Sequence, residues 1–187
     1  MKNFLIILFS AFFSTFTFAQ EEHMKFMGIP LDGTINQFQT KLATKGMTVD
    51  YAANKYIGVG SRRFKGFFSG EEAVVYVYYN EKTKNVYRAK VVIDSPVENI
   101  RDEKYKSFVS KLSKKYINAE SKLGTYEGRE ATSFSVPNKN RGLFQYLGYI
   151  DVYCVNPEGS SISYALHLDY FDAINLSKYE NKNMDDL

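Results

Sequence analysis

Few residues in this chain have the types and spacing that catalysis requires. Cys154 and His167 are the obvious nucleophile and base. Side chains alternate along a strand, however, and this alternation predicts that the two lie on opposite faces of one hairpin. Cys154 then fits a small core residue. His167 and Asp169 are two positions apart and share a face, with Asp151 expected close by, so they form either a surface polar cluster or an acid–base pair.

Other motifs are weak. Gly58-Val59-Gly60 lacks a third glycine and a following helix start, which argues against nucleotide binding. No GxSxG, HExxH or CxxC occurs, and one cysteine with two histidines excludes a disulfide framework and argues against a histidine-rich metal centre. We therefore expect no catalytic residue, no metal and no cofactor, with Cys154 either free or linked to another chain.

Alternation predicts two different faces on a first hairpin, which joins residues 73–79 to residues 86–93. Pairing odd with odd positions aligns Val75 and Val77 with apolar residues of the partner strand, including Tyr87, whereas a one-residue slip mixes Arg88 and Lys90 into the core. The hairpin of residues 149–155 and 161–171 follows the same logic. Each half therefore has an apolar face, expected beneath a helix, and a second face rich in tyrosine.

That second face is the candidate binding surface. Tyrosine combines rigid contact area with one hydrogen-bonding group, which suits binding, although aromatic residues also suit ordinary half-wet strands. The predicted ligand- or partner-binding residues are Tyr76, Tyr78, Arg88, Lys90, Tyr149, Tyr153, His167 and Asp169.

The elements that position these residues are readable from the pattern. Thr34 with Gln37 predicts a capping box and a helix over 34–45. A three-stranded meander is expected over 61–94, and Ser95 is expected to cap a second helix over 97–116. One or two strands in 120–147 precede the second hairpin, and residues 177–187 are expected to be a flexible tail. The fold class is α+β, with two αβββ units (about 26–94 and 95–176) sharing one core in a single domain over 20–176.

The first 19 residues predict a cleaved export signal. Lys2 precedes an uncharged apolar run over 4–18, and Ala19 fits cleavage before Gln20. A membrane anchor is the alternative, but the run is shorter than the roughly 20 residues that span a bilayer. We expect a periplasmic or secreted protein with no membrane span after cleavage. The net charge of +3 does not indicate a nucleic-acid partner. The second helix carries an excess of lysine and arginine, which suits either solvent or an anionic partner.

Several segments resemble a known group of proteins. These are FMGIPLDGTINQFQTKLATKGM (26–47), FKGFFSG (64–70), VYVYYNEKTKNVYRAKVVI (75–93), LSKKY (112–116) and the late GYIDVYCV and YALHLDYFDAIN. Over most of residues 26–175 the chain resembles a family of uncharacterised secreted proteins of Bacteroidota, which implies a periplasmic or surface location and no known activity. The doubled layout is also similar to beta-lactamase-inhibitor-like and PepSY-like tandem modules, which implies a protein that binds or inhibits.

Three functions remain at this point. The leading one is an exported, non-catalytic module that meets a protein or peptide of the cell envelope through its tyrosine-rich face. The second is a carrier that holds a small apolar or glycan-like ligand between sheet and helices, and the third is a hydrolase-type enzyme using His167 and Asp169. An open tyrosine face favours the first, a closed cavity the second, and a cleft converging on His167 the third.

Overall fold

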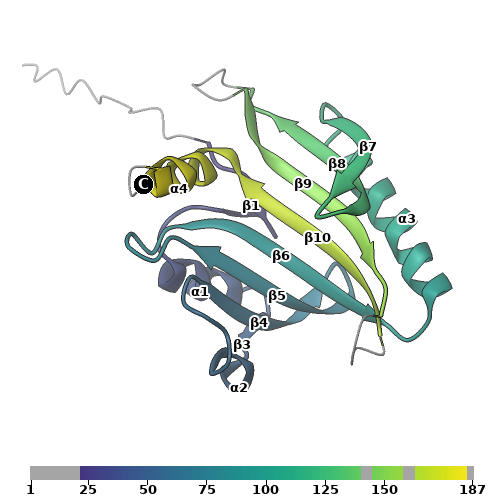
Figure 1. Ribbon diagram of the computed structural model, residues 1–187, viewed down its shortest axis with the longest axis horizontal. Coiled ribbons are helices and arrows are strands. Elements are labelled where there is room, and N and C mark those ends of the chain that lie inside the picture. Colours follow the sequence, from purple (N-terminus) through teal and green to yellow (C-terminus); the bar gives the residue numbers. More distant parts are fainter. Residues whose placement is uncertain (1–21, 140–144, 158–162, 185–187) are drawn as a thin grey trace, which may run out of the picture.

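The computed structural model describes residues 22–139, 145–157 and 163–184 (Figure 1). The expected signal and the turn at 158–159 lie outside these residues. The first half contains β1 (Lys25–Phe26), β2 (Ile29–Pro30), α1 (Ile35–Ala43), β3 (Thr48–Val49), α2 (Tyr51–Asn54), β4 (Ser61–Phe68), β5 (Glu71–Tyr79) and β6 (Val86–Ser95). The second contains α3 (Glu98–Lys115), β7 (Glu120–Tyr126), β8 (Arg129–Pro137), β9 (Tyr146–Val155), β10 (Tyr164–Asp172) and α4 (Ala173–Met184).

Eight of these strands form one antiparallel sheet in the order β3-β4-β5-β6-β10-β9-β8-β7. The α+β class is confirmed. Each half supplies four strands rather than the three expected, because β3 precedes the first meander and residues 120–137 form two strands. The last strands of the halves, β6 and β10, are neighbours in the middle of the sheet.

The helices begin for identifiable reasons. At α1 the Thr34 side chain accepts a hydrogen bond from the Gln37 backbone and the Gln37 side chain caps the Thr34 backbone, so the predicted capping box is confirmed. At α3 the prediction was wrong, because Val97 occupies the N-cap position without a side-chain hydrogen bond. Ser95 still belongs to β6, where it pairs with Tyr164, and its hydroxyl donates to the Val97 carbonyl.

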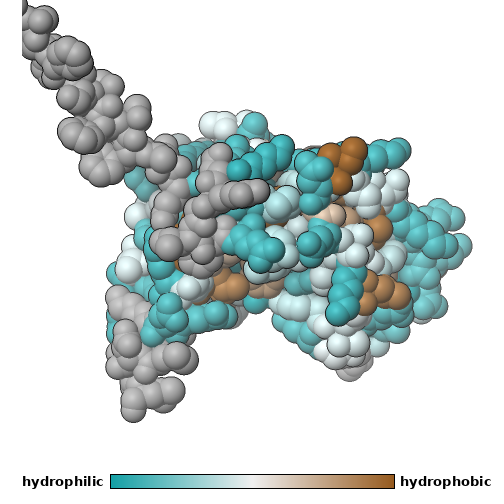
Figure 2. Space-filling model, turned by 90° about the horizontal axis from the view of Figure 1, so that it is seen from above, coloured by the Kyte–Doolittle hydropathy of each residue, from teal (hydrophilic) through white to brown (hydrophobic). Residues whose placement is uncertain are grey.

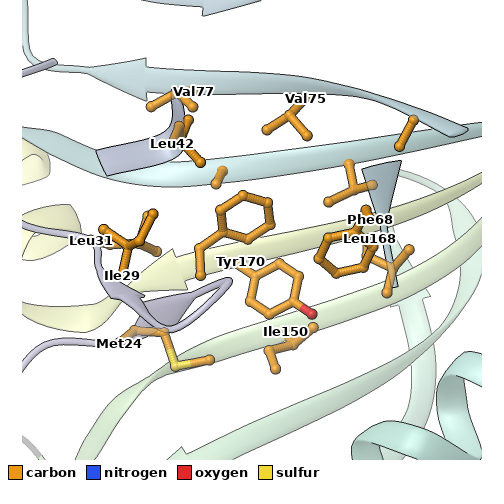
Figure 3. Packing of buried hydrophobic residues seen from close by; sticks show 14 of the residues in the cluster. Met24, Ile29, Leu31, Leu42, Phe68, Val75, Val77, Ile150, Leu168 and Tyr170 are labelled. Atoms are coloured by element: carbon orange, nitrogen blue, oxygen red, sulfur yellow. The ribbon is translucent and has the colours of Figure 1, made fainter. Parts of the chain in front are cut away.

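One face of the sheet carries the core. The predicted registers are confirmed: Val75 lies opposite Val91, and Cys154 lies opposite Leu166. The β1–β2 hairpin, α1 and α3 bury this face. Tyr170 meets the rings of Phe26 and Phe68 edge to face, and Figure 3 shows Tyr170 and Phe68 among the buried side chains. Cys154 packs against this core while His167 faces the other way, as predicted.

A β-bulge changes the expected position of Tyr87. The register places Tyr78 opposite Arg88 but Tyr79 opposite Val86, so Tyr87 is the extra residue. Val86 is fully buried in its place, and Tyr87 turns from the core face to stack on Tyr179 of α4, with ring centroids 4.5 Å apart. The boundary expected at residue 177 therefore falls inside a packed helix rather than at the start of a tail.

Candidate functional site

All eight predicted site residues lie on the face opposite the core. Strand pairing arranges this face in rows that cross the sheet. Tyr76, Lys90 and Asp169 stand in one row, which Asp151 extends. Two further rows hold Tyr78, Arg88 and Tyr149, and His167 with Tyr153. The eight residues therefore share one face, as the alternation predicts, although they are not equally exposed.

At the centre of this face Arg88 binds Asp169. The Arg88 Nε donates to Asp169 Oδ1 at 2.8 Å and Nη2 donates to Oδ2 at 2.5 Å, while the Asp169 side chain is fully buried. Tyr78 and Phe171 lie against the guanidinium, at 4.6 and 4.9 Å from their ring centroids. Burial by itself lowers the pKa of Arg88, but the hydrogen bond and charge of Asp169 raise it above its usual value. Arg88 is therefore a fixed charge.

Tyr153 is sealed inside, which corrects the expectation that it faces solvent. Its side chain is fully buried, and its hydroxyl lies 3.2 Å from Nδ1 of His167. The ring of Tyr126 packs on it at 5.1 Å, and the ammonium of Lys90 lies 5.5 Å from its centre. Burial first, with the charges of Lys90 and Arg129, lowers the pKa of His167 to about 3. Tyr153 and His167 thus form part of an inner polar layer.

The tip of the β7–β8 hairpin covers this layer. Tyr126 donates its hydroxyl hydrogen to Asp169 Oδ2 at 3.3 Å and accepts one from Arg88 at 3.2 Å. Glu127 lies 3.7 Å from Arg88 and 3.9 Å from Lys90. These contacts hold the hairpin over the strands of the sheet centre, where Figure 1 shows it lying in front of β10.

A pocket of about 410 Å³ opens between this hairpin tip and α4; we call it the tyrosine pocket. Seen from above in Figure 2, the mostly polar surface is hollowed between these two elements. Of the predicted residues, Arg88 and Tyr149 line it. The remaining lining residues are Tyr87, Tyr126, Asp151, Phe171, Leu176, Tyr179 and Glu180. The aromatic rings among these residues form the walls of the pocket, and the exposed side chain of Tyr149 lies at its edge.

Two carboxyl groups give the tyrosine pocket its acidic side. Asp151 is buried beside Ser133, whose hydroxyl donates to it, and Glu180 is exposed. Burial raises the pKa of Asp151, and the Ser133 hydrogen bond only partly offsets this. The pocket can therefore offer a carboxyl acceptor and phenol hydroxyls to a ligand that also presents flat apolar surface.

The predicted acid–base pair is not assembled. Both oxygens of Asp169 accept hydrogen bonds from Arg88, and the Nδ1 atom of His167 is occupied by Tyr153. Neither His167 nor Asp169 lines the tyrosine pocket. Within the described part of the chain, no three histidine, cysteine or acidic side chains gather as metal ligands would.

Four aromatic residues of the pocket were not predicted from the sequence. Tyr87 was assigned to the core because the bulge leaves no signal in the alternation. Tyr179 was left out because residues 177–187 were expected to be a tail. Tyr126 reaches the site through the curl of the hairpin, which no local pattern encodes. Phe171 alone was predictable, because it continues the phase of His167 and Asp169.

Comparison of the chain with protein-family models, with curated proteins and with solved structures gives no match. The resemblance to secreted proteins of Bacteroidota stays a prediction. Among residues 22–139, 145–157 and 163–184, no helix combines the length and apolar character needed to cross a bilayer.

Proposed function

We propose that this protein is an exported, non-catalytic module that binds a protein or peptide at the tyrosine pocket and along the neighbouring tyrosines of β5. One observation carries the proposal: five aromatic rings from four strands and α4 surround an opening on the face away from the core. Interfaces favour tyrosine because a rigid ring loses little conformational entropy on binding and keeps one polar group.

An open site favours a macromolecular partner over an enclosed small ligand. The tyrosine pocket opens to solvent, and Tyr149, 37% exposed, stands at its edge. Half-buried Tyr76 and Tyr78 continue the aromatic surface along β5. If one side chain of a bound peptide filled the pocket, the adjacent residues of that peptide would lie on the rings of Tyr76 and Tyr78. Protein interfaces commonly combine one such buried anchor with flatter contacts around it. The carrier and hydrolase alternatives find less support on this face.

Export and a doubled architecture belong to the same proposal. The positive residue, apolar run and small cleavage residue at 2–19 support removal of a signal and a periplasmic or secreted location. In each half a helix (α1 or α3) precedes a meander whose last strand joins the sheet centre. This order supports two helix-plus-meander units that share one core, with the tyrosine pocket close to their junction.

The test compares two sets of tyrosines in the mature protein, residues 20–187. One variant combines Tyr76→Ser, Tyr78→Ser and Tyr149→Ser. Its matched control combines Tyr51→Ser and Tyr56→Ser, which remove two tyrosines 74% and 90% exposed outside this face. Each protein is used as bait for envelope extract, and captured proteins are identified by mass spectrometry.

We expect a partner that the wild type and the Tyr51/Tyr56 control capture and the face variant loses. A photo-crosslinking amino acid at position 149 should then join the partner directly. Capture that is equal for all three baits, or crosslinking only from position 56, contradicts the proposal. Tyr153 is left unchanged because its burial would turn the test into one of stability.

A further inference from the structure

We propose that a second site, on the opposite side of the sheet, binds a single-chain amphiphile with a carboxylate head group. The site is a hollow of about 310 Å³ between the C-terminal half of α3 and the turns of the first half. This volume lies at the lower end of the range of small-molecule sites. The inference is independent of the tyrosine pocket, because the two sites share no lining residue.

The walls of this hollow, the α3 pocket, are apolar. Phe68 stacks on Phe108 with ring centroids 5.8 Å apart, and Met27 and Leu112 add to this apolar part of the lining. A neighbouring hollow of about 320 Å³ lies between α3 and the β1–β2 hairpin and shares Lys115 with the α3 pocket. Its lining includes Tyr116 and Leu147. Flexible methionine beside rings suits an alkyl chain.

A polar group without a partner lies inside these walls. Tyr170 is only 3% exposed and lines the α3 pocket, yet among the described residues none forms a hydrogen bond with its hydroxyl. Figure 3 shows this oxygen at the end of the ring that points away from Ile29 and Leu31. Burial, with nearby Tyr116, raises the pKa of Tyr170, so the hydroxyl stays a donor. Tyr170 is not among the described side chains with a fully enclosed, unpartnered polar atom, so its hydroxyl opens onto the hollow and can donate to a ligand oxygen.

The rim supplies the charge. Lys111 and Lys115 line the opening on successive turns of α3, at 5.0 and 4.9 Å from the rings of Phe108 and Tyr116. None of the described residues that line the α3 pocket is acidic. Two cations, one hydroxyl donor that opens onto the hollow and apolar rings match a carboxylate on an alkyl chain, with the head group beside Lys115 and the chain among the rings.

The probes are decanoate, decan-1-ol and decyltrimethylammonium, each titrated calorimetrically into the mature protein below its aggregation concentration. We expect decanoate to bind about tenfold more tightly than decan-1-ol, since a hydrogen bond to a charged group is worth that factor. The cationic probe should bind least. No binding of decanoate, or equal binding of all three probes, overturns the proposal.

Variants distinguish binding at this site from non-specific hydrophobic binding. Lys111→Gln with Lys115→Gln should weaken decanoate binding about tenfold and leave decan-1-ol unchanged. Lys114→Gln is the matched control, because this exposed lysine of α3 does not line the pocket. Tyr170→Phe should weaken decanoate severalfold while removing only one atom. Equal effects of the Lys111/Lys115 and Lys114 variants contradict the site.

A membrane surface offers similar head-group chemistry and is tested apart. Vesicles of phosphatidylglycerol are sedimented with the protein in parallel. Sedimentation with vesicles that is lost in the Lys111/Lys115 variant, together with absent decanoate binding, would make the helix a lipid-surface contact and overturn the free-ligand assignment. Decanoate binding without sedimentation supports it.

Discussion

Arg88 on β6 holds both carboxylate oxygens of Asp169 on β10, so one bidentate ion pair joins the last strands of the two halves. The contact is diagonal, since Arg88 stands directly opposite Phe171 and Asp169 opposite Lys90. Tyr126 binds both members from the β7–β8 hairpin. This pair therefore links the sheet centre to the wall of the tyrosine pocket.

Removing one member of this pair should be costly. Arg88→Leu leaves the Asp169 carboxylate buried with its best partner gone, and such losses typically cost about 3–5 kcal/mol. Urea unfolding should show this loss of unfolding free energy, with no change in the slope of that free energy against urea concentration. Arg88→Leu combined with Asp169→Leu should cost less than the sum of the single variants, because it leaves no unpaired charge. Additive single effects would mean that the two side chains do not interact.

Asp151→Asn should stabilise the protein at pH 7. Burial raises the folded-state pKa of Asp151 above its unfolded value, so the folded protein binds a proton more readily than the unfolded chain. Stability from this group is complete below the unfolded pKa of about 3.9 and is lost as pH rises through the folded value. Asparagine stays neutral and still accepts a hydrogen bond from Ser133. The urea concentration at the unfolding midpoint should be higher for the variant than for the wild type at pH 7, and the two midpoints should become equal near pH 3.

Glu180→Gln is the control for that experiment, because this exposed carboxyl lines the same pocket without being buried. Its urea midpoint should follow the wild type throughout. An Asp151→Asn protein that is less stable than wild type at pH 7 would show that the carboxylate has a favourable partner in solution.

His167 should stay neutral well below the usual histidine range. Its folded-state pKa of about 3 lies below the unfolded value of about 6.5, so the unfolded chain takes up a proton first as pH falls. The stability contributed by neutral His167 is therefore complete above pH 6.5 and declines from there toward pH 3. Its ring resonances, assigned with His167→Gln, should not titrate in NMR spectra between pH 8 and 5. A midpoint near 6 would contradict the sealed inner layer.

The sequence predicts what local patterns encode. Alternation identified the register of both hairpins and the common face of Tyr76, Arg88 and Asp169, because a one-residue slip would bury charge. Three features could not be predicted from these local patterns. The bulge at Tyr87 keeps the same residue types, Ser95 has the composition of a cap while still pairing as a strand, and Tyr126 reaches Asp169 only through the three-dimensional curl of β7 and β8.

Gly148→Ala should destabilise the protein more than any other glycine-to-alanine change in a strand. A Cβ at Gly148 would collide with the Phe171 carbonyl oxygen and lie 2.8 Å from the Cβ of Met24. Neither can retreat, because β9 pairs with β10 there and Asp172 holds the Met24 N–H at 2.8 Å. We expect a loss of about 3 kcal/mol in urea unfolding, the upper end of the usual range for overpacked cores. Gly124→Ala in β7 is the control: no atom lies within 4 Å of its added Cβ, and stability should change by less than about 0.5 kcal/mol. An equally small change in both variants would mean that β9 and β10 can move apart at this end, and with them the part of the tyrosine pocket that Tyr149 and Phe171 line.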